Sequence, residues 1–202
     1  FPAWIRQVDW RPDGAQFSGG GEDGNVYIWD AESGALVQTM GKHHNLVTSV
    51  AWSADGKSLA SGSSGSDSGE LFLWDAQRGE RLRSFEGHPG IVYSLAWSSD
   101  GDLLVSGGSD GMLRWWDAQT GVCLLVRQAH RGAVQALRRS PDGTLLASCG
   151  DDGAITVWNL ASGDALQTMR RDRPYERLNI TGITGLSEAQ KATLLALGAV
   201  EG

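Results

Sequence analysis

Three residue types that can do chemistry together recur along this 202-residue chain. Histidine, serine and aspartate stand at matched spacing as His88, Ser106 and Asp110, and again as His130, Ser148 and Asp152. Serine hydrolases use this trio, because the carboxylate orients the imidazole and the imidazole takes the proton of the attacking hydroxyl. The pattern therefore raises the hypothesis of a hydrolase with Ser106 or Ser148 as its nucleophile.

The repetition favours a different role. A third copy offers His43 and Ser61, with Asp67 or Ser68 as candidates for the acidic position. Each copy also has a tryptophan, at Trp74, Trp116 or Trp158. An enzyme needs one nucleophile in one cleft, whereas buried imidazole, hydroxyl, carboxylate and indole groups can satisfy one another's hydrogen bonds. We therefore expect these sets to hold the fold together and expect no catalytic residue among them.

The sets belong to a sequence unit that repeats four times. Each unit begins with a strand-length run of alternating apolar residues, starting at Ile5, Val47, Val92 and Val134. A tight turn follows each run, at Asp13-Gly14, Asp55-Gly56, Asp100-Gly101 and Asp142-Gly143. Glycine can take the positive φ that such a reversal requires. With three more short runs per unit, a period in the low forties is typical of β-propeller blades.

The recurring Gly-His, Ser, Asp-Gly and Trp-Asp elements resemble the WD-repeat β-propeller family over residues 1 to about 170. The resemblance implies an all-β fold of four-stranded antiparallel blades, at about 1–42, 43–87, 88–129 and 130–170. It also implies that each His, Ser, Asp and Trp set forms one buried hydrogen-bonded tetrad. In the first repeat it points to Ser18, Asp23 and Trp29, but Phe1 stands at the histidine position, so no equal tetrad is expected there.

Composition excludes several classes of function. The formal net charge is −7, whereas nucleic-acid binding needs clustered lysine and arginine. Cys123 and Cys149 are the only thiols, and their spacing indicates neither a zinc site nor a disulfide framework. No run approaches the roughly 18 apolar residues of a membrane span. We expect a cytoplasmic protein with no metal, no cofactor, no nucleic-acid partner and no membrane partner.

Large side chains end the first strand of each repeat. Trp10, Trp52 and Trp97 are expected to pack between neighbouring blades, and the fourth repeat has Arg138 and Arg139 at this place. Two interpretations of the arginine pair stay open: an ion pair with an acidic neighbour, or contact with an anionic ligand.

The repeat stops near Arg170, and a tail of residues 171–202 follows. Ser187 and Gln190 form a capping box, which predicts a short helix from about residue 188 to 197. Residues 173–201 resemble the ends of bacterial signalling proteins that couple a NACHT- or NB-ARC-type nucleotide-switch domain to WD repeats. The helix can also simply cover an edge or face of the propeller.

Four blades are few for a ring, because propellers have about four to eight blades. Three possibilities stay open: part of a longer propeller, which we favour, two copies forming one ring, or a closed four-bladed ring. An open arc leaves unpaired blade faces, so the isolated chain is expected to associate with itself or with further blades of a longer parent chain.

We expect a non-catalytic scaffold that binds a protein or peptide through loops at one end of the blades. The expected contacts are His44, Asn45, Leu46, Pro89, Ile91, Arg131 and the inserted loop 63–68. The alternatives are a hydrolase that uses one of the His/Ser/Asp sets, and a purely structural arc within a larger assembly.

Overall fold

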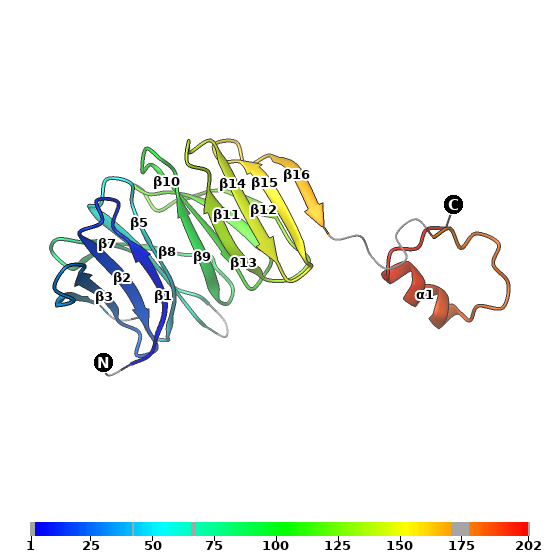
Figure 1. Cartoon of the computed structure of the whole chain (residues 1–202), viewed down its shortest axis with the longest axis horizontal. Helices are drawn as coiled ribbons and strands as arrows, with labels where there is room; N and C mark the ends of the chain where they lie inside the picture. Colours follow the sequence, from blue (N-terminus) through cyan, green and yellow to red (C-terminus); the bar gives the residue numbers. More distant parts are fainter. Residues whose placement is uncertain (1–2, 42, 66–67, 171–177, 202) are drawn as a thin grey trace. The chain divides into compact units, whose positions relative to one another are not determined.

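The fold is taken from a computed structural model of the chain, which describes residues 3–41, 43–65, 68–170 and 178–201. The chain divides into two compact units, one ending at Thr168 and the other beginning at Met169. The first unit is built of β-strands, and the second contains one short helix (Figure 1).

The first unit consists of four separate antiparallel sheets, each of four strands in sequence order, which confirms the predicted all-β blade architecture. Blade 1 contains β1 (Ile5–Trp10), β2 (Gln16–Gly21), β3 (Val26–Asp30) and β4 (Leu36–Met40). Blade 2 contains β5 (Val47–Trp52), β6 (Ser58–Ser63), β7 (Leu71–Asp75) and β8 (Glu80–Phe85). Blade 3 contains β9 (Val92–Trp97), β10 (Leu103–Gly108), β11 (Met112–Asp117) and β12 (Cys123–Gln128). Blade 4 contains β13 (Val134–Arg139), β14 (Leu145–Gly150), β15 (Ala154–Asn159) and β16 (Ala165–Arg170).

An Asp-Gly turn joins the first two strands of every blade. In blade 4, Gly143 has φ +77°, and the Asp142 carboxylate accepts the backbone N–H of Thr144 at 3.2 Å and the hydroxyl of Ser140 at 2.5 Å. These bonds lower the pKa of Asp142, with the Ser140 hydroxyl as the largest cause. Each turn therefore fixes its hairpin register with local hydrogen bonds alone.

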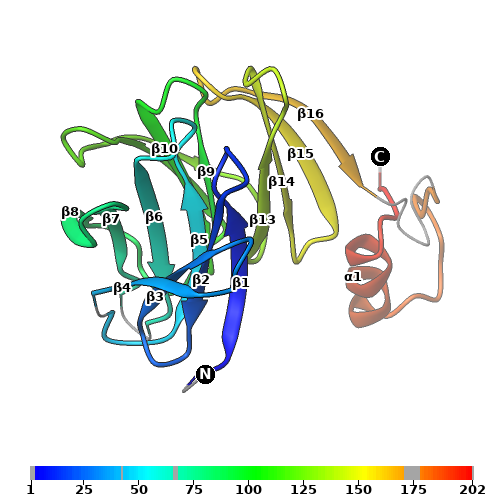
Figure 2. The same cartoon turned by 60° about the vertical axis from the view of Figure 1, so that its left-hand side comes forward.

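The core lies between the blades rather than within them. The first strands β1, β5, β9 and β13 contact one another in that order along the inner side of the arc (Figure 2). Three apolar clusters fill the spaces between successive blades. Trp52 and Trp97 are 6% and 5% exposed in the first two interfaces, as expected.

A glycine in the second strand lets each blade receive the next one. A Cβ at Gly20, Gly62 or Gly107 would lie only 2.5–2.6 Å from a methyl carbon of the first valine of the following blade. The same ladder position in blade 4 holds Cys149. Blade 4 therefore lacks the glycine against which the first valine of the next blade packs in the other three blades.

The outer face of blade 1 is an apolar surface without a neighbouring blade. Val8 and Trp10 are 55% and 58% exposed, whereas their counterparts in blade 2, Val50 and Trp52, are 2% and 6% exposed. Trp10 contacts Phe17 with the ring centroids 5.5 Å apart. The four described blades therefore form an open arc rather than a closed four-bladed ring.

The second unit is small and centres on α1, which runs from Glu188 to Ala196. The Ser187 hydroxyl accepts the backbone N–H of Gln190, whose side chain accepts the N–H of Ser187. A parallel bridge joins Asn179 to Val200. Residues 171–177 of the tail lie outside the described residues. None of the described helices is long and apolar enough to cross a membrane.

Candidate functional site

Blade 4 brings all four members of its predicted set together. His130 Nδ1 lies 2.9 Å from Asp152 Oδ1, and His130 Nε2 lies 2.8 Å from Ser148 Oγ. The indole N–H of Trp158 donates to the same Ser148 Oγ at 2.9 Å. With the imidazole proton on Nδ1, the histidine donates to the carboxylate and accepts from the serine, so every polar atom has a partner.

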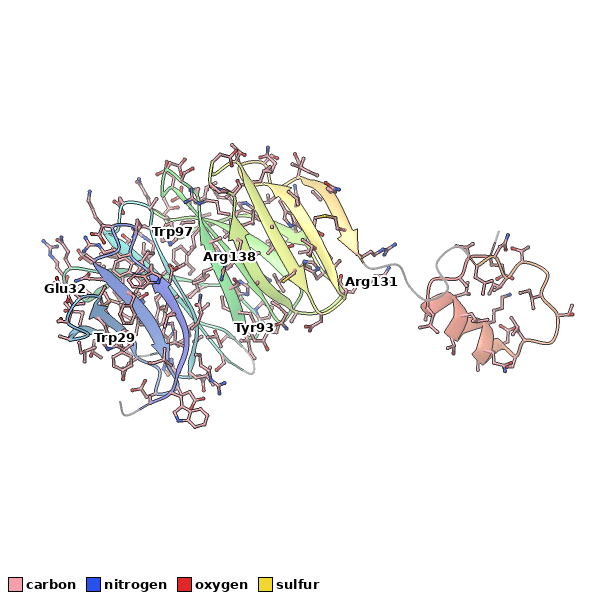
Figure 3. All side chains as sticks on the ribbon, in the orientation of Figure 1. Trp29, Glu32, Tyr93, Trp97, Arg131 and Arg138 are labelled. Carbon is pink, nitrogen blue, oxygen red and sulfur yellow. The ribbon has the colours of Figure 1, made fainter. Side chains whose placement is uncertain are left out.

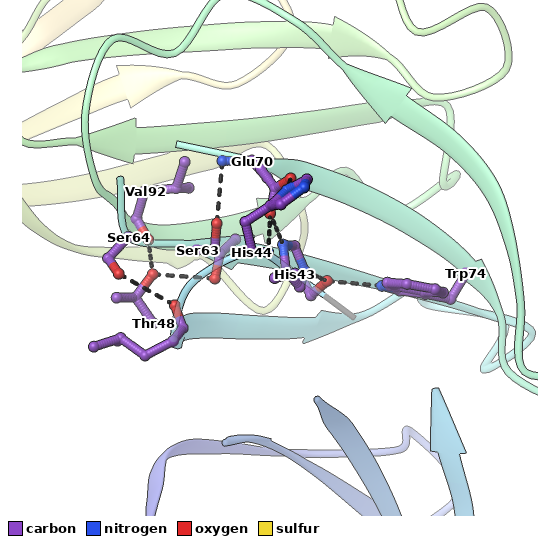
Figure 4. Close-up of polar contacts among 11 residues, drawn as sticks. His43, His44, Thr48, Ser63, Ser64, Glu70, Trp74 and Val92 are labelled. Carbon is purple, nitrogen blue, oxygen red and sulfur yellow. Dashed lines mark hydrogen bonds and ion pairs between the residues drawn. The ribbon is translucent and has the colours of Figure 1, made fainter. Parts of the chain in front are cut away.

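Blade 2 forms the same network with a different acid (Figure 4). His43 Nε2 lies 2.6 Å from Ser61 Oγ, which also accepts the indole N–H of Trp74 at 2.7 Å. The carboxylate facing His43 Nδ1 belongs to Glu70, at 3.2 Å. The acid was predicted at Asp67 or Ser68, but Ser68 is exposed and Asp67 lies outside the described residues. The longer loop returns to the sheet at Glu70, directly before β7, and the Glu70 carboxylate takes the role of the predicted acid.

Glu70 also holds the neighbouring loop. Its Oε2 accepts the backbone N–H of His44 at 2.8 Å, and its Oε1 lies 2.5 Å from His44 Nδ1. One carboxylate thus binds a buried and an exposed imidazole. Burial alone would raise the pKa of Glu70, but the bonds from His44 and the charge of His43 lower it overall.

Blade 3 departs from the prediction at its aspartate. His88 Nε2 bonds to Ser106 Oγ at 2.7 Å, and Trp116 donates to that oxygen at 2.7 Å. Asp110 instead pairs with Arg114, whose Nη2 lies 2.7 Å from its Oδ2. Arg114 is buried and stands opposite Ser106 in the strand ladder, where blade 2 has Phe72 and blade 4 has Thr156. Its guanidinium takes the space between His88 and Asp110.

Blade 1 has lost the serine of the set as well as the histidine. Its Gly19 occupies the ladder position of Ser61, Ser106 and Ser148. The predicted Ser18 is one residue away, so its side chain faces the opposite side of the sheet, where its hydroxyl donates to the Asp9 carbonyl at 3.4 Å. Asp23 binds the Tyr27 hydroxyl at 2.5 Å. Phe1 lies outside the described residues.

Burial sets the protonation of two of the histidines. It lowers the pKa of His43 to about 4 against the opposing pull of Glu70. It also lowers the pKa of His88 to about 4, and the positive charge of Arg114 adds to the effect. Both imidazoles are therefore neutral near pH 7.

The networks of blades 2 and 4 join an acid, a histidine and a serine as a hydrolytic triad does, but they are closed to a substrate. Ser61, Ser106 and Ser148 are at most 1% exposed, and each hydroxyl oxygen already accepts an indole N–H. A substrate carbonyl cannot reach these oxygens without opening the blade. The geometry therefore supports a structural role for the sets.

The family comparison agrees with this geometry. The sequence profile of the family described as "WD domain, G-beta repeat" matches residues 2–30, 34–75, 79–117 and 121–159. The chain belongs to the WD-repeat family. The repeats are staggered against the blades, since the match at 34–75 takes β4 from blade 1 and β5–β7 from blade 2. The matches at 34–75, 79–117 and 121–159 therefore each link two sheets, whereas the match at 2–30 covers β1–β3 of blade 1.

Individual relatives are similar over part of their length. The chain is 36% identical over 59 residues to "Periodic tryptophan protein 2 homolog" of Caenorhabditis elegans, covering 29% of this chain and 6% of that protein. It is 31% identical over 58 residues to "Ciliary WD repeat-containing protein ctxp80" of Euplotoides octocarinatus, covering 29% of this chain and 8% of that protein.

A solved structure, "Crystal Structure of Mitotic Checkpoint Complex", contains a similar chain with a TM-score of 0.74 and 32% identity. The match covers 83% of this WD-repeat chain and 51% of that chain. The chain thus spans about half the length of this solved relative.

The tetrads place the predicted contact loops at one end of the WD blades. We call this end the loop face and define it by residues 43–46, 89–91 and 131–133 with the turns 22–25, 68–70, 109–111 and 151–153. His44, Asn45, Pro89 and Arg131 are exposed there, while Leu46 and Ile91 are half-buried.

Each loop of the loop face is tied to a turn of the blade that follows it. The Arg131 N–H donates to Asp152 Oδ2 at 3.1 Å, and the Ile91 N–H donates to Ser109 Oγ at 3.0 Å. The Ser64 N–H donates to the Leu46 carbonyl at 3.0 Å. The loops therefore present exposed side chains from a fixed backbone. The sequence did not predict the roles of Glu70 and Ser109. The only signals for them were that Glu70 directly precedes a strand and that Ser109 lies in a tight turn.

Proposed function

We propose that this WD-repeat arc is a non-catalytic scaffold that recognises a protein or peptide at the loop face. The observation that carries the proposal is the double use of each acid: Asp152 and Glu70 bind a buried histidine and also fix the backbone of the adjacent exposed loop. Fixed loops lose little conformational entropy when a partner binds, which favours affinity.

The loop face offers mixed chemistry for such a partner. His44 and Asn45 provide hydrogen-bond donors and acceptors, Pro89 provides an apolar contact, and Arg131 provides a charge. These groups come from three successive blades, so an extended segment that crosses the arc would contact them together. A peptide or a protein loop has this shape.

A random peptide phage library panned against the 202-residue chain tests this proposal. Selected peptides should bind the wild-type chain and should lose about tenfold or more affinity to the variant His44→Ala/Arg131→Ala. The matched control Lys57→Ala/Arg78→Ala removes exposed charges from the other end of the blades and should bind normally. Equal loss in both variants, or no enrichment of peptides, contradicts the proposal.

We also propose that blade 1 packs against a further blade of a longer parent chain. Its outer face has apolar side chains, Val8 and Trp10, at the positions that are buried in blade 2. A further blade would bury them in the same way as blade 1 buries Val50 and Trp52. In light scattering, the isolated 202-residue chain should self-associate, and Val8→Ser/Trp10→Ser should reduce the association. A stable wild-type monomer contradicts the proposal.

The opposite end of the arc argues against a ring of two copies. In the geometry of the three internal interfaces, blade 1 of a second copy would place Ile5 where Val47, Val92 and Val134 meet a glycine. Blade 4 presents Cys149 at that position, so the two side chains would collide. A closed ring of two chains in electron micrographs would contradict this inference.

The cellular setting extends the proposal. We infer from the resemblance of residues 173–201 that the chain is the sensor part of a cytoplasmic bacterial signalling or defence-type NTPase with a NACHT or NB-ARC domain. Mass spectrometry of the endogenous protein should then find a longer polypeptide that contains nucleotide-binding sequence. A polypeptide without such sequence contradicts this inference.

A further inference from the structure

A cavity of about 320 Å³ lies at the end of the blades opposite the loop face. All four inner strands, β1, β5, β9 and β13, contribute to it at their carboxyl ends. Its wall includes Trp10, Trp52 and Trp97, together with Asp9, Arg138 and Arg139. Figure 3 shows Trp97 and Arg138 at one end of the blades and Tyr93 and Arg131 at the other.

Packing between blades does not account for the two arginines. Arg139 stands at the ladder position of Trp52 and Trp97, which fill the interfaces, and Arg138 stands at the position of Ala51 and Ala96. Those four counterparts are buried, whereas Arg138 is exposed and Arg139 is half-buried. Blade 4 thus replaces two interface side chains by two cations.

The arginines are not neutralised by a contacting acid. No carboxylate of the described residues lies within 4.0 Å of either guanidinium, and Arg138 Nη1 donates to the carbonyl of Leu137 at 2.8 Å. Asp9 also lines the cavity: burial raises its pKa, the charge of Arg138 opposes that rise, and its Oδ2 accepts the backbone N–H of Trp52 at 2.8 Å, so Asp9 offsets one of the two positive charges without contacting a guanidinium. The ion-pair interpretation of these arginines is therefore not realised, and one excess positive charge remains in a chain of net charge −7.

The cavity combines this charge with apolar surface. The side chains of Pro12, Ala54 and Leu95, with further alanine and leucine side chains of the inner strands, form part of the wall. Ligand sites generally join an apolar wall to a few convergent polar groups, and a guanidinium suits a carboxylate because its planar fork can donate two hydrogen bonds.

We propose that this cavity binds an organic carboxylate that carries an aromatic or apolar group. Arg138 and Arg139 hold the carboxylate, and the alanine, leucine and proline side chains of the wall contact the apolar group. The carboxylate can belong to a free small molecule or to an acidic residue of a peptide. This site is separate from the loop face, so its test is independent of the scaffold proposal.

Calorimetric titration of the 202-residue chain with three probes tests the site. N-acetyl-phenylalanine supplies a free carboxylate, its amide is the neutral control, and acetyl-Ala-Phe-Glu-Phe-Ala-amide supplies an internal acidic residue. The site requires that at least one carboxylate probe binds and that the amide binds at least tenfold more weakly. Binding of only the free acid identifies a small-molecule ligand, and binding of the peptide identifies a peptide segment.

Variants locate the binding. Arg138→Gln/Arg139→Gln should weaken the carboxylate probe by about tenfold to a hundredfold, since charge-assisted hydrogen bonds are lost. Arg127→Gln changes an exposed arginine of β12 outside both the cavity and the loop face, and it should leave binding unchanged. The Arg138→Lys/Arg139→Lys pair keeps the charge without the planar fork and should lose less than the glutamine pair. Circular dichroism checks that the variants fold. Equal binding of acid and amide, no binding of either carboxylate, or normal binding by the glutamine variant overturns the proposal.

Discussion

The guanidinium Nη2 of Arg114 lies 2.7 Å from Oδ2 of Asp110 and takes the carboxylate that blade 3 was predicted to give to His88. Arg114 Nη1 in turn lies 3.5 Å from His88 Nδ1. Blade 3 has all four residues of the predicted set in its sequence, yet its aspartate does not contact the histidine. The hydrogen bonds among His88, Ser106 and Trp116 remain. The carboxylate of Asp110 pairs with Arg114 in place of the histidine.

Removing Arg114 should destabilise the chain. Arg114→Ala leaves the partly buried Asp110 carboxylate without its cation, so we expect a loss of about 1–3 kcal/mol in the free energy of unfolding. Urea denaturation measures it. Arg131→Ala, which removes an exposed arginine, should change stability by less than about 0.5 kcal/mol. Equal stability of the two variants would show that the Arg114–Asp110 pair contributes nothing.

Stability should fall as the pH is lowered from about 6.5 towards 4. His43 and His88 have a pKa of about 4 when folded, against about 6.5 for an unfolded histidine, so the unfolded chain binds more protons in this window. Each histidine contributes about 1.4 kcal/mol per pH unit between its two pKa values. Burial raises the pKa of Asp9, so this group is protonated more readily in the folded chain than in the unfolded chain. Near the lower end of the pH range its protonation therefore offsets part of the loss of stability.

Denaturation at several pH values between 4 and 7 checks this prediction. His88→Gln removes one titrating group and should reduce the slope of stability against pH. The carboxylates with lowered pKa, such as Asp152, take up protons at a lower pH than the range in which the two histidines affect stability. A stability that does not change over this range would contradict the burial of neutral imidazoles.

Glu70 should control the order of the first contact loop. Glu70→Gln keeps the size of the side chain but removes the charge that both His43 and His44 face, so we expect faster amide exchange at residues 43–46 and a loss of about 1–2 kcal/mol. Hydrogen exchange with mass spectrometry measures the first effect. Ser68→Ala, an exposed change in the same loop, is the control. Unchanged exchange in Glu70→Gln would remove Glu70 from the network.

Gly62 should tolerate no side chain. A Cβ there would lie 2.6 Å from Val92 Cγ1 and 2.6 Å from Ser49 Oγ, so Gly62→Ala should cost about 1–3 kcal/mol through overpacking of the interface between blades 2 and 3. Thermal denaturation measures the loss. Cys149→Ala, at the same ladder position in blade 4, should have a smaller effect. A loss for Gly62→Ala no larger than that for Cys149→Ala would contradict the close packing of Gly62 against Val92.

The strand order and blade architecture were predictable from the sequence because they depend on local signals. Asp-Gly turns and alternating apolar residues specify each hairpin by themselves, as in Asp142-Gly143. The capping box likewise involves only the four residues from Ser187 to Gln190, and it marks the start of the helix.

The partners within the buried networks depend on register and reach, which spacing does not fix. Ser18 looked equivalent to Ser61, but the ladder places Gly19 there, and one residue reverses the facing side. Glu70 was hidden behind a longer loop. The residues on either side of Arg114 follow the predicted repeat pattern. Only the structure shows that the Arg114 side chain is buried inside the blade.

We propose that the His/Ser sets are buried supports and that recognition belongs to the loops. Incubation of the folded chain with a fluorophosphonate probe, followed by peptide mapping, separates this role from catalysis. We predict no adduct on Ser61, Ser106 or Ser148, because each oxygen is buried and accepts an indole N–H. A stoichiometric adduct on any of these serines in the folded chain would contradict the claim and favour a hydrolase.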